Sequence, residues 1–177
     1  MNTRQRLLAA ALIAASVTAA HAAERATAEL VDRQGNAIGT ATLVDGPHGL
    51  LIHVSAKGLP AGPKGIHIHG IGTCADNDKG FTASGAHVNP AGKKHGLLNP
   101  EGPDAGDLPN IFAHADGSVE AELFTPLASL SGTDGRATLL DADGAALVIH
   151  ENRDDHVSQP IGGAGARIAC GVLKATP

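Results

Sequence analysis

The feature that most limits the fold of this chain is a regular series of short β-type segments. From Ala26 onward, stretches rich in Val, Ile, Leu and Thr alternate with turn signals such as Asp116-Gly117 and Asp143-Gly144. Beyond residue 23, no long window carries a convincing 3.6-residue hydrophobic period, and 125–132 (TPLASLSG) is expected to form at most a short turn. The pattern predicts an all-β protein, and the 23 glycines favour a sandwich or closed barrel.

Nine segments are candidate strands, and we expect eight in the final fold. The candidates are 26–32, 37–45, 50–59, 65–71, 110–115, 118–124, 137–141, 146–151 and 166–173. Two longer segments, 71–109 and 151–166, interrupt the rhythm. Long loops in a compact domain are usually functional, so we expect the chemistry of the protein to lie there.

The first 22 residues have the features of an export signal. Two arginines precede a short apolar run from Leu7 to Val17, and Ala20-His21-Ala22 has the small-x-small pattern of a cleavage site. The apolar run is too short to span a bilayer. We therefore expect 1–22 to be a signal peptide cleaved near Ala22, and 23–177 to form one exported domain.

Charge and cysteine content narrow the partners and the compartment. Without the leader, 11 basic side chains face 18 acidic ones, a net charge of −7, which argues against nucleic acid and anionic membranes as partners. The chain has no Trp or Tyr on which bases could stack. Export implies an oxidising compartment, so the only two cysteines, Cys74 and Cys170, are expected to form a disulfide; two free buried thiols are the alternative.

One stretch, 65–107, collects four of the ten histidines together with carboxylates. Its candidate ligands are His67, His69, His87, His95, Asp104 and Asp107. Imidazole and carboxylate are the ligands that copper and zinc prefer, so the stretch predicts a metal site. His67 and His69 are two residues apart on an expected strand and therefore share one face. Such a pair alone is as often solvated as metal-binding, and the other ligand types strengthen the prediction.

The motifs around these residues resemble those of the copper–zinc superoxide dismutases, most closely the exported bacterial branch. GIHIH with Gly72-Thr73-Cys74 is similar to the copper-binding strand, and AHVNP, KKHG and GDLPN are similar to the zinc loop. VIHENRDDH and GGAGARIACGV resemble the segments of the last copper ligand, the second loop and the active-site arginine. The resemblance covers the mature chain. It implies an eight-stranded antiparallel Greek-key barrel or sandwich with two long functional loops, a periplasmic location, and either a monomer or a homodimer.

The same resemblance implies one copper and one zinc ion per chain. The copper ligands would be His67, His69, His87 and His150; the zinc ligands would be His87, as a bridging imidazolate, with His95, Asp104 and Asp107. Asp104 stands where the family has a histidine. Either Asp104 is a ligand and zinc has two carboxylate ligands, or the site is completed by water or only partly occupied. Asp154 matches a carboxylate that links a copper histidine to a zinc histidine.

The implied activity is the dismutation of superoxide to dioxygen and hydrogen peroxide. His87 would carry a proton to the outgoing peroxide, and Arg167 would dock the superoxide anion. Because the chain is acidic overall, Lys79, Lys93 and Lys94 are candidates for steering that anion. A non-catalytic copper-binding or copper-delivery domain and a copper-only dismutase with a degenerate zinc site are the alternatives. The complete copper set with Arg167 favours the enzyme.

Overall fold

The computed structural model describes residues 24–132 and 134–176, so the expected leader lies outside the described residues. The strands are β1 (Arg25–Asp32), β2 (Ala37–Gly46), β3 (Gly49–Ala56), β4 (Gly62–Lys64), β5 (Ile66–His69), β6 (Ile111–Ala113), β7 (Val119–Thr125), β8 (Ala128–Ser129), β9 (Ala137–Thr138), β10 (Ala146–His150), β11 (Arg167–Val172) and β12 (Lys174–Thr176). Two short 3₁₀ helices, η1 (Asn77–Lys79) and η2 (Thr82–Ser84), lie in the first long loop. The all-β prediction is confirmed.

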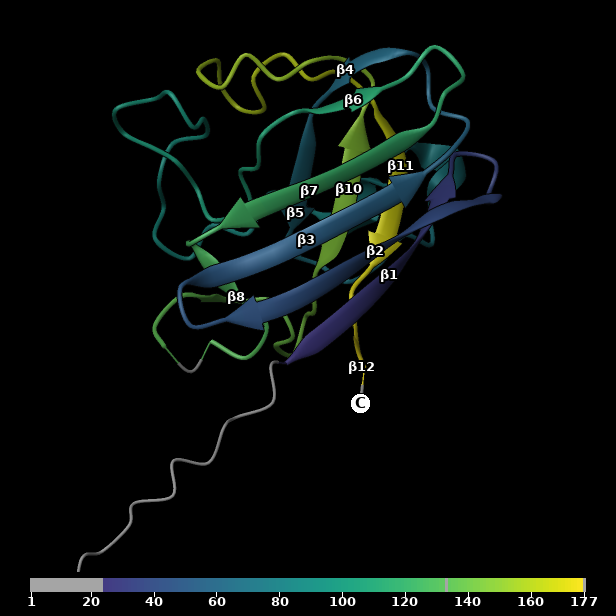
Figure 1. The fold of residues 1–177 in the computed structure, drawn as a ribbon. Helices are drawn as coiled ribbons and strands as arrows, with labels where there is room; N and C mark the ends of the chain where they lie inside the picture. The colour runs from purple at the N-terminus through teal and green to yellow at the C-terminus, as the bar shows by residue number, and fades with distance from the viewer. Residues whose placement is uncertain (1–23, 133, 177) are drawn as a thin grey trace, which may run out of the picture.

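One curled antiparallel sheet of eight strands forms the body of the protein. Its order is β5-β10-β11-β1-β2-β3-β7, and β12 also pairs with β1. Figure 1 shows β1, β2, β3 and β7 across the front and β5, β10 and β11 behind them. The small sheet β4–β6 connects to the two edge strands of the large sheet: β4 is followed in the chain by β5, and β6 is followed by β7. The connections from β3 to β5 and from β7 to β10 cross between the two sheet edges, as in a Greek-key barrel.

The stretch 125–132 differs from its prediction of at most a turn. It contains β8, which pairs in parallel with β9. Three further backbone hydrogen bonds tie the two segments together, among them Leu139 N–H to the Ser129 carbonyl oxygen at 3.0 Å. A strand of two residues is too short to show alternation, and its partner is supplied by the chain path, so the sequence pattern could not reveal it.

Strand alternation separates the core from the future site. Ile66 and Ile68 of β5 pack into the main apolar core inside the sheet. His67 and His69 alternate with them and therefore point to the outer face. All four residues are buried, because the loop from 70 to 110 covers that outer face. A smaller cluster around Phe81 lies on the same outer side, with Ala146 and Val148 of β10.

The disulfide between Cys74 and Cys170 is formed, as predicted. The two Cα atoms are 5.8 Å apart although the residues are separated by 96 positions. Cys170 lies in β11, three residues after Arg167, and Cys74 lies in the loop that follows β5. The bond therefore ties the covering loop to the strand that begins with Arg167.

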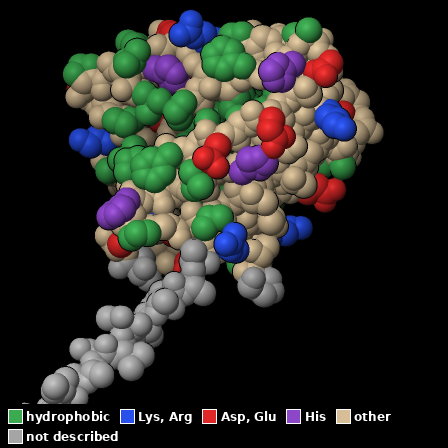
Figure 2. Space-filling model, in the orientation of Figure 1, with side chains coloured by type: hydrophobic (Ala, Val, Ile, Leu, Met, Phe, Trp, Pro, Cys, Tyr) green, Lys and Arg blue, Asp and Glu red, His purple; other side chains and the backbone are tan. Residues whose placement is uncertain are grey.

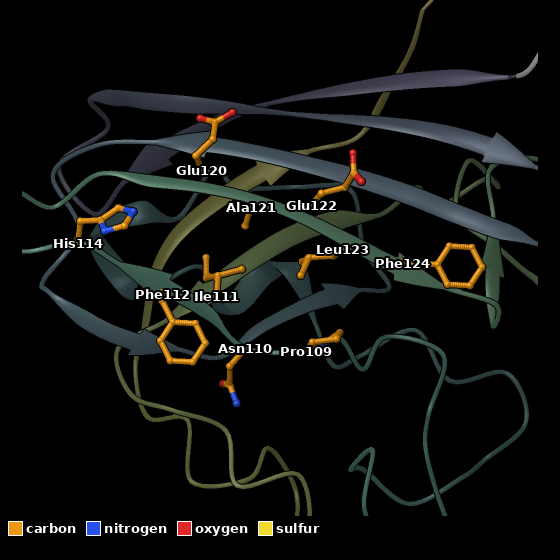
Figure 3. Close-up of a pocket in the computed structure, with 10 residues that line it drawn as sticks. All are labelled: Pro109, Asn110, Ile111, Phe112, His114, Glu120, Ala121, Glu122, Leu123 and Phe124. Atoms are coloured by element: carbon orange, nitrogen blue, oxygen red, sulfur yellow. The ribbon is translucent and has the colours of Figure 1, made fainter.

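The outer face of β6 and β7 carries an exposed apolar surface. Phe112 is 65% exposed and Phe124 is 51% exposed, although the chain has only three phenylalanines. They border a shallow hollow of about 570 Å³ (Figure 3), and Figure 2 shows hydrophobic side chains gathered over these strands. Among the residues described, no helix has the length and apolar character needed to cross a membrane.

Candidate metal centre

Strands β5 and β10 bring His67, His69 and His150 together. Their antiparallel register places Val148 opposite His67 and Ala146 opposite His69. The pairing of β10 with β11 shifts register between Ile149 and His150, at the end of the strand. The ring centroids of His67 and His150 are 4.8 Å apart, and one ring nitrogen of each of His67, His69 and His150 lies within 4.8 Å of the others.

Among the described residues, each of these three imidazoles has one nitrogen with a hydrogen-bond partner and one without. His69 and His150 hold Nδ1 against backbone carbonyl oxygens at 2.9 and 3.1 Å. His67 instead holds Nε2 against Asp154 Oδ2, at 2.8 Å. The opposite nitrogens, His67 Nδ1 and the Nε2 atoms of His69 and His150, are buried without a hydrogen-bond partner in 24–132 and 134–176. Buried polar atoms are rarely left unpaired, so these nitrogens fit a copper ion that they would ligate together.

Burial keeps this group of histidines neutral. Removal from water lowers the pKa of His69 to about 2, with the nearby Arg167 charge acting in the same direction. Burial also lowers the pKa of His150 to about 3. The pKa of His67 is lowered because burial outweighs the opposing effect of Asp154. Neutral imidazole is the form that binds metal ions, so this group needs no deprotonation before it can act as a ligand set.

His87 lies between this group and a second one. It comes from the covering loop and forms an isolated β-bridge with His69. Its ring centroid is 4.2 Å from that of His67 and 5.2 Å from that of His69. His87 Nδ1 is 3.0 Å from Asp104 Oδ2 and 3.5 Å from Asp107 Oδ1, whereas Nε2 is buried without a partner in the described ranges. His87 thus turns Nδ1 to the carboxylates of the second group, while its ring lies against His67 and His69 of the first.

The second group consists of His87, His95, Asp104 and Asp107, whose candidate ligand atoms lie within 4.8 Å of one another. His95 Nδ1 and Asp107 Oδ1 are 2.5 Å apart, yet neither atom has hydrogen-bond geometry with any described partner. The other oxygen of Asp107 accepts two backbone N–H bonds at 2.7 and 3.0 Å, and Asp104 Oδ1 accepts one at 2.9 Å. Each carboxylate is fixed by one oxygen and leaves the other for a cation, which fits zinc.

Charge pairing dominates this second group in the absence of a metal ion. Burial alone would lower the pKa of His95, but the carboxylates of Asp107 and Asp154 raise it to about 10. The pKa of His87 is also raised, because Asp104 and Asp107 outweigh burial. His87 and His95 hold the pKa of Asp107 well below its usual range in spite of burial. A metal ion at this position would replace protons on the two histidines.

Asp154 connects the two groups. Its Oδ2 contacts His67 Nε2 at 2.8 Å, and its Oδ1 contacts His95 Nε2 at 3.1 Å. Asp154 is fully buried, and its Oδ1 also accepts the backbone N–H of His156 at 2.6 Å. Carboxylates in such positions fix the orientation and tautomer of ligating histidines. The structure thus places Asp154 between His67 of the first group and His95 of the second.

Arg167 lies beside a pocket that opens over the histidines. One terminal nitrogen donates to the Phe81 carbonyl oxygen at 2.7 Å and to Ser84 Oγ at 3.1 Å, and the other donates to the Gly85 carbonyl oxygen at 2.8 Å. Burial lowers the pKa of Arg167, and Asp76 opposes that effect. Guanidinium stays charged in proteins, so Arg167 is a fixed cation.

The pocket itself has a volume of about 320 Å³. Its lining includes His69, His87, Lys93 and Arg167. Lys93 is therefore the steering candidate that borders the pocket. Lys79 and Lys94 are exposed elsewhere on the same loop and are not part of this lining.

Two amide side chains, which the sequence interpretation did not single out, also contact the site residues. Gln159 hydrogen-bonds to the backbone of His95, and Asn110 hydrogen-bonds to the backbone of Asp154. Asn110 belongs to the GDLPN motif and Gln159 precedes GGAGAR, so their proximity to motifs was the only available signal. Amides are not typical ligands of copper or zinc, and both contacts depend on how the two loops meet.

Fold and site together define a class: an all-β protein whose sheet carries, beneath a long loop, a histidine–carboxylate cluster suited to two metal ions. A sequence model of the family copper/zinc superoxide dismutase (SODC) matches residues 37–173. The protein named Superoxide dismutase [Cu-Zn] of Caulobacter vibrioides is 52% identical over 150 residues, which cover 84% of this chain and 85% of that protein. The chain belongs to the copper/zinc superoxide dismutase family.

Solved structures agree with this assignment. A superoxide dismutase-like protein from Bacillus subtilis has a TM-score of 0.77 at 42% identity, covering 84% of this chain and 97% of that one. The Cu/Zn superoxide dismutase from Brucella abortus has a TM-score of 0.68 at 31% identity, covering 85% and 100%. The expected eight-stranded fold is confirmed by this likeness and by the curled sheet.

Proposed function

We propose that this protein is an exported enzyme that converts superoxide to dioxygen and hydrogen peroxide, with one copper and one zinc ion per chain. The observation that carries the proposal is the set of buried ring nitrogens without hydrogen-bond partners among the described residues. They are His67 Nδ1 and the Nε2 atoms of His69, His87 and His150. Relatives named as copper–zinc superoxide dismutases support the same activity.

Copper would supply a one-electron redox couple. Zinc, which has no redox chemistry, would supply positive charge and hold the covering loop in place. The chain supplies the binding site for the anion and passes on one of the two protons that hydrogen peroxide requires, the other coming from solvent. When Nε2 of His87 is free, it can hold a proton and donate it to the departing peroxide. In the metal-free protein, Asp104 and Asp107 lie beside the other ring nitrogen, Nδ1, and raise the pKa of His87 against the effect of burial.

Arg167 would bind superoxide in the pocket that it borders with His69 and His87. Three hydrogen bonds to the covering loop fix its guanidinium, so the docking cation needs no rearrangement when the anion arrives. Lys93 lines the same pocket and would attract superoxide towards a protein of net negative charge. A carrier that only delivers copper needs no such anion site, which favours the enzyme over the copper-delivery alternative.

For zinc, we propose the ligands His87, His95, Asp104 and Asp107. Asp104 is included because it is only 4% exposed and turns Oδ2 towards the group. Replacement of Asp104 by Ala is expected to weaken zinc binding by at least about tenfold, the scale reported for residues that only support metal ligands. The matched control is Asp78→Ala at an exposed position of η1. Unchanged zinc affinity in Asp104→Ala would instead favour the water-completed site.

The function is tested by metal analysis of the purified protein together with a superoxide assay before and after copper loading. We expect both metals to bind and activity to follow copper content. Copper-loaded protein without activity would overturn the proposal in favour of a copper-binding domain. Full activity with copper and substoichiometric zinc would favour the copper-only alternative.

Export and assembly need separate measurements. The N-terminus of protein recovered from the periplasm is expected at Ala23, after cleavage of the leader. The exposed Phe112 and Phe124 support a homodimer over a monomer, since large exposed apolar patches often mark interaction sites. Light scattering over a range of concentrations decides between the two states.

A further inference from the structure

The two long loops meet at His95, where a side chain of one binds the backbone of the other. His95 N–H donates to Gln159 Oε1 at 3.1 Å, and Gln159 Nε2 donates to the His95 carbonyl oxygen at 2.8 Å. These residues are 64 positions apart. The Gln159 amide therefore pairs with both the backbone N–H and the backbone carbonyl oxygen of His95, as a neighbouring β-strand would.

This contact bears on the orientation of the His95 ring. The ring is held at Nε2 by Asp154 at 3.1 Å, while Nδ1 lies beside Asp107 Oδ1 without a hydrogen-bond partner among the residues described. A ring anchored at one atom can still swing if its backbone shifts. Gln159 fixes that backbone. A third hydrogen bond to the same backbone comes from Asn99 Nδ2, which donates to the His95 carbonyl oxygen at 3.0 Å.

We propose that Gln159 is a positioning residue for the zinc site: through the His95 backbone, it keeps His95 Nδ1 directed at the same point as the carboxylate of Asp107. This inference rests on the zinc ligands proposed above. The amide oxygen and nitrogen of Gln159 are both engaged by the His95 backbone, so Gln159 is not among the proposed ligands. Its effect is therefore on zinc affinity and on the geometry of the site.

The chemistry of the contact explains why glutamine suits this position. The side chain must accept one hydrogen bond and donate another, which an amide does and a carboxylate does not. Gln159 Nε2 also donates to the Val157 carbonyl oxygen at 3.0 Å. Asp155 caps the same turn, since its Oδ1 accepts the N–H groups of Val157 and Ser158 at 2.8 Å each. Hydrogen bonds within the loop thus help to orient the Gln159 amide towards His95.

A second amide makes the same two-bond contact and provides a comparison. Asp154 N–H donates to Asn110 Oδ1 at 2.9 Å, and Asn110 Nδ2 donates to the Asp154 carbonyl oxygen at 2.8 Å. Asp154 contacts a histidine of each group, so removal of the Asn110 amide is expected to weaken copper and zinc binding together. Among the proposed metal ligands and Asp154, Gln159 hydrogen-bonds only to His95, so its removal is expected to weaken zinc binding alone.

The experiment compares Gln159→Ala and Gln159→Glu with the parent protein. Zinc and copper affinities are measured by competition with chelators, and cobalt(II) absorption reports the geometry of the zinc site. Both variants are expected to lose about tenfold or more in zinc affinity and to alter the cobalt spectrum, with copper affinity unchanged. Gln159→Glu tests the chemistry sharply, because it keeps the shape but loses the donor. Gln34→Ala, in the exposed turn after β1, is the matched control.

The outcomes separate the inference from the proposed function. A parent protein that binds no zinc would overturn the zinc site itself, and this inference with it, before any variant is compared. A parent that binds zinc while both variants bind it equally well would overturn the positioning role alone. So would a parallel loss of copper and zinc affinity with a less stable metal-free protein, because that pattern indicates general loosening of the loop.

Discussion

Two adjacent glycines offer a sharp test of the link between the metal groups. Gly162 and Gly163 both have a left-handed backbone, with φ of +59° and +67°. A Cβ added at Gly162 would overlap Asp154 Oδ1 and lie 2.9 Å from His95 Nε2, whereas a Cβ at Gly163 meets nothing within 4 Å. The variants Gly162→Ala and Gly163→Ala therefore share the backbone strain and differ in the collision.

The expected magnitudes follow from those contacts. The left-handed conformation costs an alanine roughly 1–2 kcal/mol at either position. Gly162→Ala must also displace the buried Asp154 carboxylate from His67 and His95, which it contacts at 2.8 and 3.1 Å. Loss of such a supporting partner costs about 10- to 100-fold in metal affinity, or about 1.4–2.7 kcal/mol per metal ion.

The assay is chelator competition for zinc and copper, with urea unfolding of the metal-free variants. Both variants are expected to lose stability from strain, Gly162→Ala more because of the collision, while only Gly162→Ala loses metal affinity. Equal metal affinity in the two variants would refute the inferred role of Asp154. A much larger stability loss in Gly163→Ala would refute the account of the strain.

Three further predictions concern catalysis, the disulfide and pH. Arg167→Ala is expected to lower kcat/KM for superoxide by about tenfold or more with metal content unchanged, because a docking charge is lost. For the same reason the rate of the variant should depend less on ionic strength than that of the parent. An unchanged rate in stopped-flow assays would contradict this. Reduction of the Cys74–Cys170 bond, which spans 96 positions, is expected to cost up to about 4–5 kcal/mol of unfolding free energy, as measured by urea unfolding with and without reductant. Burial lowers the pKa values of His69 to about 2 and His150 to about 3, so the unfolded chain binds more protons than the folded one below the ordinary histidine pKa of about 6.5. The unfolding free energy of the metal-free protein is expected to fall as pH drops from about 6.5 to 3, and His150→Gln should flatten that fall; a parent curve that is flat over this range would refute the desolvation argument.

Much of the fold could be predicted because it is encoded locally. Alternation and turn residues locate β1, β2, β3, β7, β10 and β11 within a few residues of their observed bounds. The same signals miss β4, β8 and β12, which have two or three residues each. These short strands exist because the chain path brings them a partner, and two or three residues carry no periodicity.

The candidate ligands could also be named from the sequence, because residue type and motif determine which atoms are available. Their geometry could not. Within the part of the chain that the structure describes, His67 Nδ1 and His69 Nε2 lack a hydrogen-bond partner, because Asp154 binds the first ring at Nε2 and the Gly85 carbonyl oxygen binds the second at Nδ1. Nothing in the spacing of His67 and His69 distinguishes the two nitrogens.

The sequence by itself determined the strand pattern, the single cysteine pair and the types of ligand. Only the tertiary structure decided which oxygen of Asp154 contacts His67 and which contacts His95, that Asp104 turns an oxygen to His87, and that Gln159 binds the backbone of His95. The physical reason is sequence distance. These contacts join residues up to 87 positions apart, and they form only where the curled sheet and its two loops bring the partners within a hydrogen bond of each other.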